Sequence, residues 1–298
     1  MPIKRFVQII LSIVLSIVVG LFAHTLSPTD TCTREALDVV LDGGHLVLQD
    51  DCVLMVSPAV IITGEVIIEG GMLHSNGVDR ILIIAEGATL TVRNTQILSG
   101  SVEIEPAYGG AILNYGDLIL QSVKISANSA ERGGGIYNAM TGRLMIVDSE
   151  LARNRAREGG AIYNLGAMVI SNSIIDDNSV RHDEIYGGYG AGIVNKGSAV
   201  IVNSQIINNR GDGEGIGIDT SGALLMRDSI IMGNQCLSDD CRGTGVLRFD
   251  GTINIRQNYW GSPDGPSEDG GGSGDGIINI EPSQFQPFLT EFPAWYQG

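Results

Sequence analysis

The chain has 298 residues and a formal net charge of −16; 43% of the residues are hydrophobic and only 5% are aromatic. One elongated domain with an aliphatic core is the simplest organisation for such a composition. Nucleic acids and anionic membrane surfaces both attract clusters of Lys and Arg, so the acidic balance argues against either as a partner. It fits an extracellular protein, or one that binds cations weakly.

The first 31 residues differ in composition from the rest of the chain. Lys4 and Arg5 precede an uncharged apolar run over residues 6–23. This is the layout of a secretory signal peptide, and the run is also long enough for an N-terminal membrane anchor. Because the basic residues stay inside, either outcome places the remaining chain outside the cytoplasm, secreted or at the cell surface. Membrane contact is expected only through this segment, if it stays uncleaved.

A short amphipathic helix is predicted over residues 33–41. Thr33 is a suitable N-cap, and four apolar residues form one stripe behind it: Ala36, Leu37, Val40 and Leu41. We expect this helix to cap the first coil of the β-structure that follows, because an uncovered sheet end invites aggregation.

Four cysteines fit an oxidising compartment. Cys32 and Cys52 flank the first predicted elements, and Cys236 and Cys241 lie in one loop. Two local disulfides are the natural pairing among the three possible ones. A zinc site is the rival interpretation, but neither pair has the C-x-x-C spacing and no His lies close to Cys236 or Cys241. No metal site is therefore predicted from the cysteines.

Residues 109–234 contain five copies of one sequence repeat. Residues 44–99 contain less regular versions of it. Each unit opens with glycine and an isoleucine and closes with Ile or Leu followed three residues later by Asn. The opening isoleucines, separated by 24, 26, 31 and 25 residues, are Ile112, Ile136, Ile162, Ile193 and Ile218. Such a period marks a solenoid, propeller or array, in which each unit buries its apolar face against the next.

The apolar runs inside each unit are short and rich in β-branched residues, and none has a helical period. About three strands per unit, joined by Gly, Asn, Asp and Ser corners, predict an all-β, right-handed parallel β-helix over residues 32–266. Stacked coils would lie about 4.8 Å apart, and we expect roughly nine or ten of them.

Asparagine recurs at two positions of the repeat, which predicts two structural ladders. We expect these residues at corners, with left-handed backbone and hydrogen bonds to the next coil. The first column comprises Asn114, Asn138, Asn164 and Asn195, and the second comprises Asn128, Asn154, Asn178, Asn209 and Asn234.

The C-terminal part is predicted in two pieces. Residues 267–276 contain mainly Gly, Ser and acidic residues, which is typical of a flexible linker. Residues 277–298 are expected to fold back, with Phe285 and Phe288 covering the last coil.

The Gly-Gly-Ala-Ile phrases at 109–112 and 159–162, with the paired x-x-Asn phrase, resemble the repeats of chlamydial polymorphic outer membrane proteins. The starting text at 33–37 and the closing text at 258–266 are similar to those of the wider group of secreted bacterial right-handed β-helix proteins. The resemblance covers residues 32–292. It implies the fold more specifically than the function, since the group includes adhesins and polysaccharide-processing enzymes. In this chain the closing phrase has Ile or Leu where the chlamydial pattern has Phe.

Enzymes of the pectin-processing β-helix group need clustered carboxylates as an acid and base pair or as Ca²⁺ ligands. Asp176 and Asp177 are the best local candidates for such a role. The companion phrases of polygalacturonases and the Arg-rich signature of pectate lyases are absent from the sequence. A solvated corner is the competing interpretation of these two residues.

The longest unit carries an insertion over residues 180–189, and loops of solenoids carry binding more often than coils do. Its aromatic and His side chains suit stacking on a sugar, and its acidic ones suit sugar hydroxyls. The candidate ligand-binding residues are His182, Asp183, Glu184, Tyr186 and Tyr189. An ordinary solvated insertion is the alternative.

Taken together, these patterns favour a non-catalytic, adhesin-like protein whose partner is a polysaccharide or cell-surface glycan. A polysaccharide lyase or glycoside hydrolase acting on an acidic polysaccharide is the alternative, and a purely structural scaffold is a third interpretation. No cofactor is predicted. Ca²⁺ is considered only because residues 268–275 contain acid and glycine, without the spacing of an EF-hand.

Overall fold

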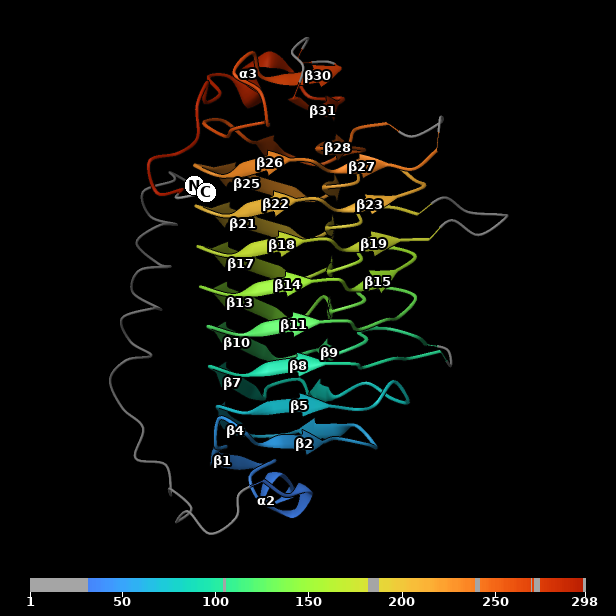
Figure 1. The fold of residues 1–298 in the computed structure, drawn as a ribbon, viewed down its shortest axis with the longest axis vertical. Coiled ribbons are helices and arrows are strands. Elements are labelled where there is room, and N and C mark those ends of the chain that lie inside the picture. Colours follow the sequence, from blue (N-terminus) through green and yellow to red (C-terminus); the bar gives the residue numbers. More distant parts are fainter. Residues whose placement is uncertain are drawn as a thin grey trace.

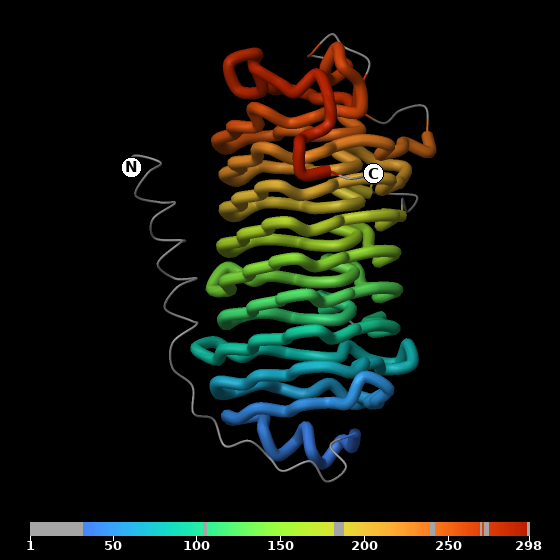
Figure 2. Tube along the Cα trace, turned by 60° about the vertical axis from the view of Figure 1, so that its left-hand side comes forward, coloured from blue at the N-terminus to red at the C-terminus, as the bar shows by residue number. Residues whose placement is uncertain are grey.

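The computed structural model describes residues 32–103, 106–181, 188–238, 242–268, 270 and 274–296. With 46% strand and 4% helix, it forms a parallel β-solenoid of about eight turns, which confirms the predicted all-β fold class. The turns stack along the long axis of the molecule, with the N-terminal helix at one end and the C-terminal elements at the other (Figures 1 and 2).

Each turn contributes one strand to each of three parallel sheets. The first sheet contains, in spatial order, β1 (Gly43–Val47), β4 (Glu65–Glu69), β7 (Thr89–Arg93), β10 (Asp117–Gln121), β13 (Arg143–Val147), β17 (Ala167–Ser171), β21 (Ser198–Val202), β25 (Ala223–Arg227) and β29 (Ile253–Asn254). The second contains β2 (Val53–Met55), β5 (Met72–His74), β8 (Gln96–Leu98), β11 (Lys124–Ser126), β14 (Glu150–Ala152), β18 (Ile174–Asp176), β22 (Gln205–Ile207) and β26 (Ile230–Met232).

The third sheet positions the candidate site described below. It contains β3 (Val60–Ile62), β6 (Leu82–Ile84), β9 (Ile112–Asn114), β12 (Ile136–Asn138), β16 (Ile162–Asn164), β20 (Ile193–Asn195), β24 (Ile218–Thr220), β28 (Val246–Arg248), β31 (Gly274–Ile278) and β30 (Pro266–Glu268). A fourth, short sheet joins β15 (Arg155–Ala156), β19 (Ser179–Val180), β23 (Arg210–Gly211) and β27 (Gln235–Cys236).

Residues that repeat in sequence stack on one another, because the sheets pair in register. In the first sheet Leu118 pairs with Leu144, which pairs with Met168 of the next turn, and all three are buried. The alternation of buried and exposed residues along these strands directs one face inward. Burying each such side chain stabilises the fold by about 1.5–3 kcal/mol. The interior is therefore a continuous aliphatic column.

Both predicted asparagine ladders are present inside the solenoid. In the first, Nδ2 of Asn138 donates to Oδ1 of Asn164 at 2.7 Å, and Asn164 donates to Asn195 at 2.8 Å. In the second, Asn154 donates to Asn178 at 3.0 Å. The expectation of left-handed backbone at these residues was wrong. Positive φ falls elsewhere, for example on Arg153, immediately before Asn154, so the bend precedes the ladder and turns the amide inward.

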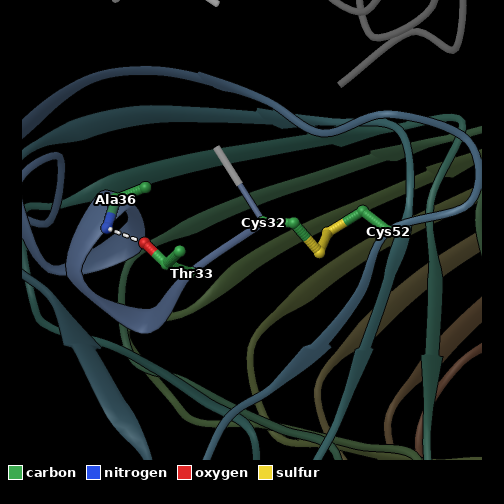
Figure 3. The surroundings of a disulfide bond; sticks show 4 residues. All are labelled: Cys32, Thr33, Ala36 and Cys52. Atoms are coloured by element: carbon green, nitrogen blue, oxygen red, sulfur yellow. Dashed lines mark hydrogen bonds between the residues drawn. A yellow bond between two sulfur atoms is a disulfide. The ribbon is translucent and has the colours of Figure 1, made fainter. Parts of the chain in front are cut away.

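A helix and a disulfide cover the N-terminal end, as predicted. Helix α2 spans Arg34–Asp38, shorter than the expected 33–41, and Oγ1 of Thr33 caps it by accepting from the backbone N–H of Ala36 at 3.2 Å. Cys32 and Cys52 form a disulfide beside this helix (Figure 3). Leu37 is fully buried against the first turn. Cys236 is also disulfide-bonded, and its predicted partner Cys241 lies outside the described residues.

Two expectations, the flexible linker over residues 267–276 and the number of turns, differ from the structure. Strand β31 begins at Gly274 and pairs with β28, so the range 267–276 predicted as a flexible linker contains part of the third sheet. The residues after β28 build only a partial turn, closed by β29 to β31 and by helix α3 (Pro282–Phe285), which explains why about eight turns form where nine or ten were expected. Phe285 is buried in the core cluster.

The predicted signal or anchor segment, residues 1–31, lies outside the described residues. Within the part of the chain that the structure describes, no helix is both long and apolar enough to cross a membrane.

Candidate functional site

The structure describes one of the five candidate residues of the predicted insertion site. His182, Asp183, Glu184 and Tyr186 lie outside the described residues. Tyr189, the last residue of the insertion, is described: it forms bridges with Glu158 and Glu214 of the adjacent turns and is half-buried.

Asp176 and Asp177 each have a partner on the next turn. Oδ1 of Asp176, at the end of β18, accepts from Nδ2 of Asn208 at 2.9 Å. Asp177 has left-handed backbone, with a φ of 52°, and pairs with Nη1 of Arg210 at 2.5 Å. Nowhere in the described ranges do three or more His, Cys, Asp or Glu residues gather so that they could hold a metal ion. These contacts give both carboxylates a role in the corner of the turn.

A different set of residues forms the most distinctive surface of the molecule, along the outer face of the third sheet. The middle residue of each short strand points away from the core, and these residues pair in register from turn to turn. We call them the outer row: Leu113, Tyr137, Tyr163, Val194 and Asp219. All five are buried although they lie outside the solenoid, and four of them belong to an apolar cluster separate from the main core.

A second row of side chains covers the outer row. It lies just before each strand of the third sheet and is joined from turn to turn by parallel bridges. We call it the facing row: Tyr108, Arg132, Glu158, Tyr189 and Glu214. The two rows together are called the strip.

The glycines of the repeat bring the two rows together. Gly109, which follows Tyr108, has a φ of 65°, and the residues after Arg132 and Glu158 are glycines with φ of 65° and 68°. A Cβ placed at Gly109 would lie 2.2 Å from the carbonyl oxygen of Ile112, so the chain reverses tightly there. The reversal places the preceding side chain over the outer row of the strand that follows.

Aromatic rings and a guanidinium fill the first turns of the strip. The ring centroids of Tyr108 and Tyr137 are 4.6 Å apart, and those of Tyr137 and Tyr163 are 5.3 Å apart, with nearly parallel planes. The guanidinium carbon of Arg132 lies 5.8 Å from the Tyr108 ring and 5.6 Å from the Tyr163 ring. Burial, together with the neighbouring tyrosines, raises the pKa of Tyr137 to about 12.

Glu158 links the aromatic part of the strip to its charged part. Its carboxylate pairs with Nε of Arg132 at 3.2 Å and with Nζ of Lys196 at 3.5 Å. Lys196 also lies 5.1 Å from the centre of the Tyr163 ring. Because the Glu158 side chain is only 12% exposed, these contacts are screened less by water than ordinary surface ion pairs.

Asp219 ends the outer row in a different environment. It is 4% exposed, and burial raises the pKa of its carboxyl to about 7; the nearby charges of Glu158 and Glu214 add to the rise, and Lys196 opposes it. None of the described residues donates a hydrogen bond to this carboxyl group. Asp219 is therefore a buried acid without a donor in the described part of the chain, which is unusual in a folded protein.

The sequence pattern did not identify the strip. The Ile-Tyr-Asn text at 136–138 and 162–164 belongs to the repeat, and in the fifth unit Asp219 precedes Thr220, which stands at the ladder position. A usable signal was present, because alternation directs the residue between the core Ile and the ladder Asn outward. Two tyrosines and one aspartate at that outward position mark it as a surface of its own.

No family model, curated protein or solved structure matches the chain. The class of the fold therefore rests on the structure itself, and the chemistry of the site rests on the geometry of the strip.

Proposed function

We propose that this chain is a non-catalytic, secreted or cell-surface β-helix protein that binds an extended glycan along the strip. The observation that carries the proposal is the strip, a column of stacked tyrosines with cationic and acidic groups beside it and the exposed rings of Tyr115 and Phe249 at its margin. Sugar rings stack on aromatic faces, and their hydroxyls bind carboxylates and ammonium groups. A linear ligand lying parallel to the solenoid axis would contact one turn after another.

Exposed aromatic residues at the margin of the strip supply faces that a ligand can reach. Tyr115 follows β9 and is 39% exposed, and Phe249 follows β28 and is 56% exposed. Each lies two residues beyond a member of the outward-facing register, Leu113 and Leu247 respectively. The buried tyrosines hold the strip rigid, and these marginal rings are the proposed stacking positions.

The location outside the cytoplasm is part of the same proposal. It is supported by the signal-like sequence of residues 1–31 and by the Cys32–Cys52 disulfide, which is typical of an oxidising compartment. The resemblance to secreted bacterial β-helix repeat proteins, including polymorphic outer membrane proteins, agrees with it.

An enzymatic alternative is favoured by one specific observation. Asp219, with its raised pKa, shares the strip with Glu158, and Lys196 pairs with Glu158 beside it, so an acid that holds its proton near neutral pH lies near a second carboxyl group. Such a combination is used for acid and base catalysis on glycosidic bonds. A polysaccharide lyase or glycoside hydrolase acting on an acidic polysaccharide would place its reaction there.

A glycan array tests the proposal, run on the purified chain with and without Ca²⁺, beside an assay for unsaturated and reducing products. We expect binding without turnover, weakened at least tenfold by Tyr115→Ala or Phe249→Ala. Met55→Ala is the matched control, because the exposure of Met55, 44%, lies between those of Tyr115 and Phe249, and Met55 belongs to the second sheet, away from the strip. Product formation abolished by Asp219→Asn would establish the enzymatic alternative instead. An array without binding would overturn the glycan proposal.

A further inference from the structure

Asp219 lies where the neighbouring turns have an apolar side chain. Its register partners in the outer row are Val194 on one side and Leu247 on the other, and both are buried. A carboxyl group at such a position loses most of its hydration, and either a retained proton or a bound donor or cation compensates for that loss. Its oxygens are not among the fully enclosed side-chain atoms that lack a partner, so they still touch solvent. The described part of the chain supplies neither a donor nor a cation in direct contact, since Lys196 acts on Asp219 only through its charge.

Two aromatic rings meet across the turn that carries Asp219. Tyr189 belongs to the turn before and bridges to Glu214 of the Asp219 turn. Phe249 belongs to the turn after, where its backbone N–H donates to the carbonyl of Thr220, the residue next to Asp219. The centroids of the Tyr189 and Phe249 rings are 6.2 Å apart at an interplanar angle of 73°. The contact between these rings therefore crosses the turn that carries Asp219.

The charges around Asp219 favour a cation. Glu158 and Glu214 are close enough to raise its pKa, and among the described residues Lys196 is the cation that acts on it. The faces of the two aromatic rings are also electron-rich and attract positive groups. An anionic ligand would be repelled by these carboxyl groups, and a neutral hydroxyl would not neutralise their negative charge.

We propose that Asp219 and Glu214, with the rings of Tyr189 and Phe249, form a subsite for the protonated primary amine of an amino sugar. The proposal rests on the glycan-binding function proposed above and names the class of sugar that this turn selects. A Ca²⁺ ion is less suitable, because it takes six to eight oxygen ligands and no group of three suitable residues is found in the described ranges. Phe249 is 56% exposed, so its ring can move to admit the ligand.

Isothermal titration calorimetry with two matched probes tests this subsite at pH 7 and low salt. The probes are a fully deacetylated glucosamine tetramer and the corresponding N-acetylglucosamine tetramer, titrated into the purified full chain. We expect the amine-bearing tetramer to bind at least tenfold more tightly. Asp219→Asn, which keeps the shape of the side chain, should reduce that preference to less than threefold, and Phe249→Ala should weaken the binding of the amine tetramer severalfold.

Asp176→Asn is the control, since Asp176 is an acid on another sheet with its own hydrogen-bond partner, and it should keep the preference. Circular dichroism and thermal unfolding establish that each variant is folded. Equal binding of the two tetramers, no binding of either, or an amine preference that survives Asp219→Asn would overturn the amine subsite. Because the array covers sugars without amines, binding found there would leave the glycan-binding proposal standing when the amine subsite fails.

Discussion

The two kinds of buried polar side chain in this solenoid have opposite environments. In β16, Asn164 points inward, accepts from Asn138 and donates to Asn195, so both neighbours in its ladder are satisfied. In β24, Asp219 points outward, is almost as buried, and receives no hydrogen bond from the described residues. Burial alone therefore does not separate a polar residue that its own ladder satisfies from one that the described residues leave without a donor. The supply of partners does.

The difference between Asn164 and Asp219 follows from the donors and acceptors that each side chain offers to the adjacent turns. A column of identical amides satisfies itself, because each Asn has both a donor and an acceptor to offer to the adjacent turns. A carboxylate has acceptors only, so a neighbouring turn must contribute a donor or a ligand must supply it. Asp219 is held between apolar neighbours in its row, so it either keeps its proton near neutral pH or takes the proposed amine as its partner.

Breaking the ladder should have the largest effect on stability. Asn164→Ala removes the acceptor of Asn138 and the donor to Asn195 deep inside the solenoid. Each buried group left without a partner costs about 1–3 kcal/mol, so we expect a loss of about 4 kcal/mol in the free energy of unfolding. Urea unfolding measures it. Gln121→Ala, at an exposed position on β10, is the control and should change stability by less than about 0.5 kcal/mol.

Replacing the buried acid of the strip, Asp219, should increase the free energy of unfolding instead of lowering it. The pKa of Asp219 rises from 3.8 to about 7 on folding, so the folded state holds the proton more tightly than the unfolded state does. Stability from this group is fully present below about pH 4 and is lost as the pH rises to about 7. Asp219→Asn should therefore stabilise the chain at pH 8 by about 4 kcal/mol, at about 1.4 kcal/mol for each unit by which the pKa is raised.

The same variant should differ little from the native chain at pH 4, where Asp219 is protonated when folded. Urea unfolding of both proteins at pH 4, 6 and 8 checks the trend. A difference in stability that stays constant across this range would contradict a buried, unpartnered acid at Asp219.

The sequence was sufficient for the ladder and insufficient for the strip, for a physical reason. Ladder residues must recur at every turn, so Asn138 and Asn164 are visible as a period in the amino-acid sequence alone. The strip depends on which way the chain reverses at Gly133 and Gly159, and that direction is not encoded in a periodicity of apolar residues. The mixed composition of the outer row, from tyrosine to valine to aspartate, also hides it as a column.

The error at the predicted linker has a related cause. Composition indicated a flexible segment over residues 267–276, but the last member of the second ladder needs a partner that no further turn provides. Asp275 fills this role by accepting from Nδ2 of Asn234 at 2.6 Å and from the backbone N–H groups of Gly233 and Asn234. The end of a repeat is satisfied by non-repeating residues, which pattern analysis cannot anticipate.

Removing that terminal acceptor should have an intermediate effect. Asp275→Ala leaves the amide of Asn234 and two backbone donors without their partner, and we expect a loss of about 2 kcal/mol because the end of the stack is nearer to water than its middle. Native-state hydrogen exchange should show the loss in the turns nearest β31. Faster exchange spread equally over the whole ladder would indicate that Asp275 is not a local cap.

The smallest effect is expected for a polar pair that is repeated between turns but open to water. Arg143 and Asp117 form a two-point ion pair between β13 and β10, with distances of 2.5 and 2.7 Å, and the arginine side chain is 74% exposed. Arg143→Ala should lower the free energy of unfolding by less than about 1 kcal/mol, and this difference should shrink as salt is added. A loss as large as that of Asn164→Ala would mean that geometry, and not burial, sets the strength of contacts between turns. The expected ranking instead means that burial determines how much a contact between turns contributes to the free energy of unfolding. For the same reason, burial makes the unpaired carboxyl group of Asp219 destabilising at high pH.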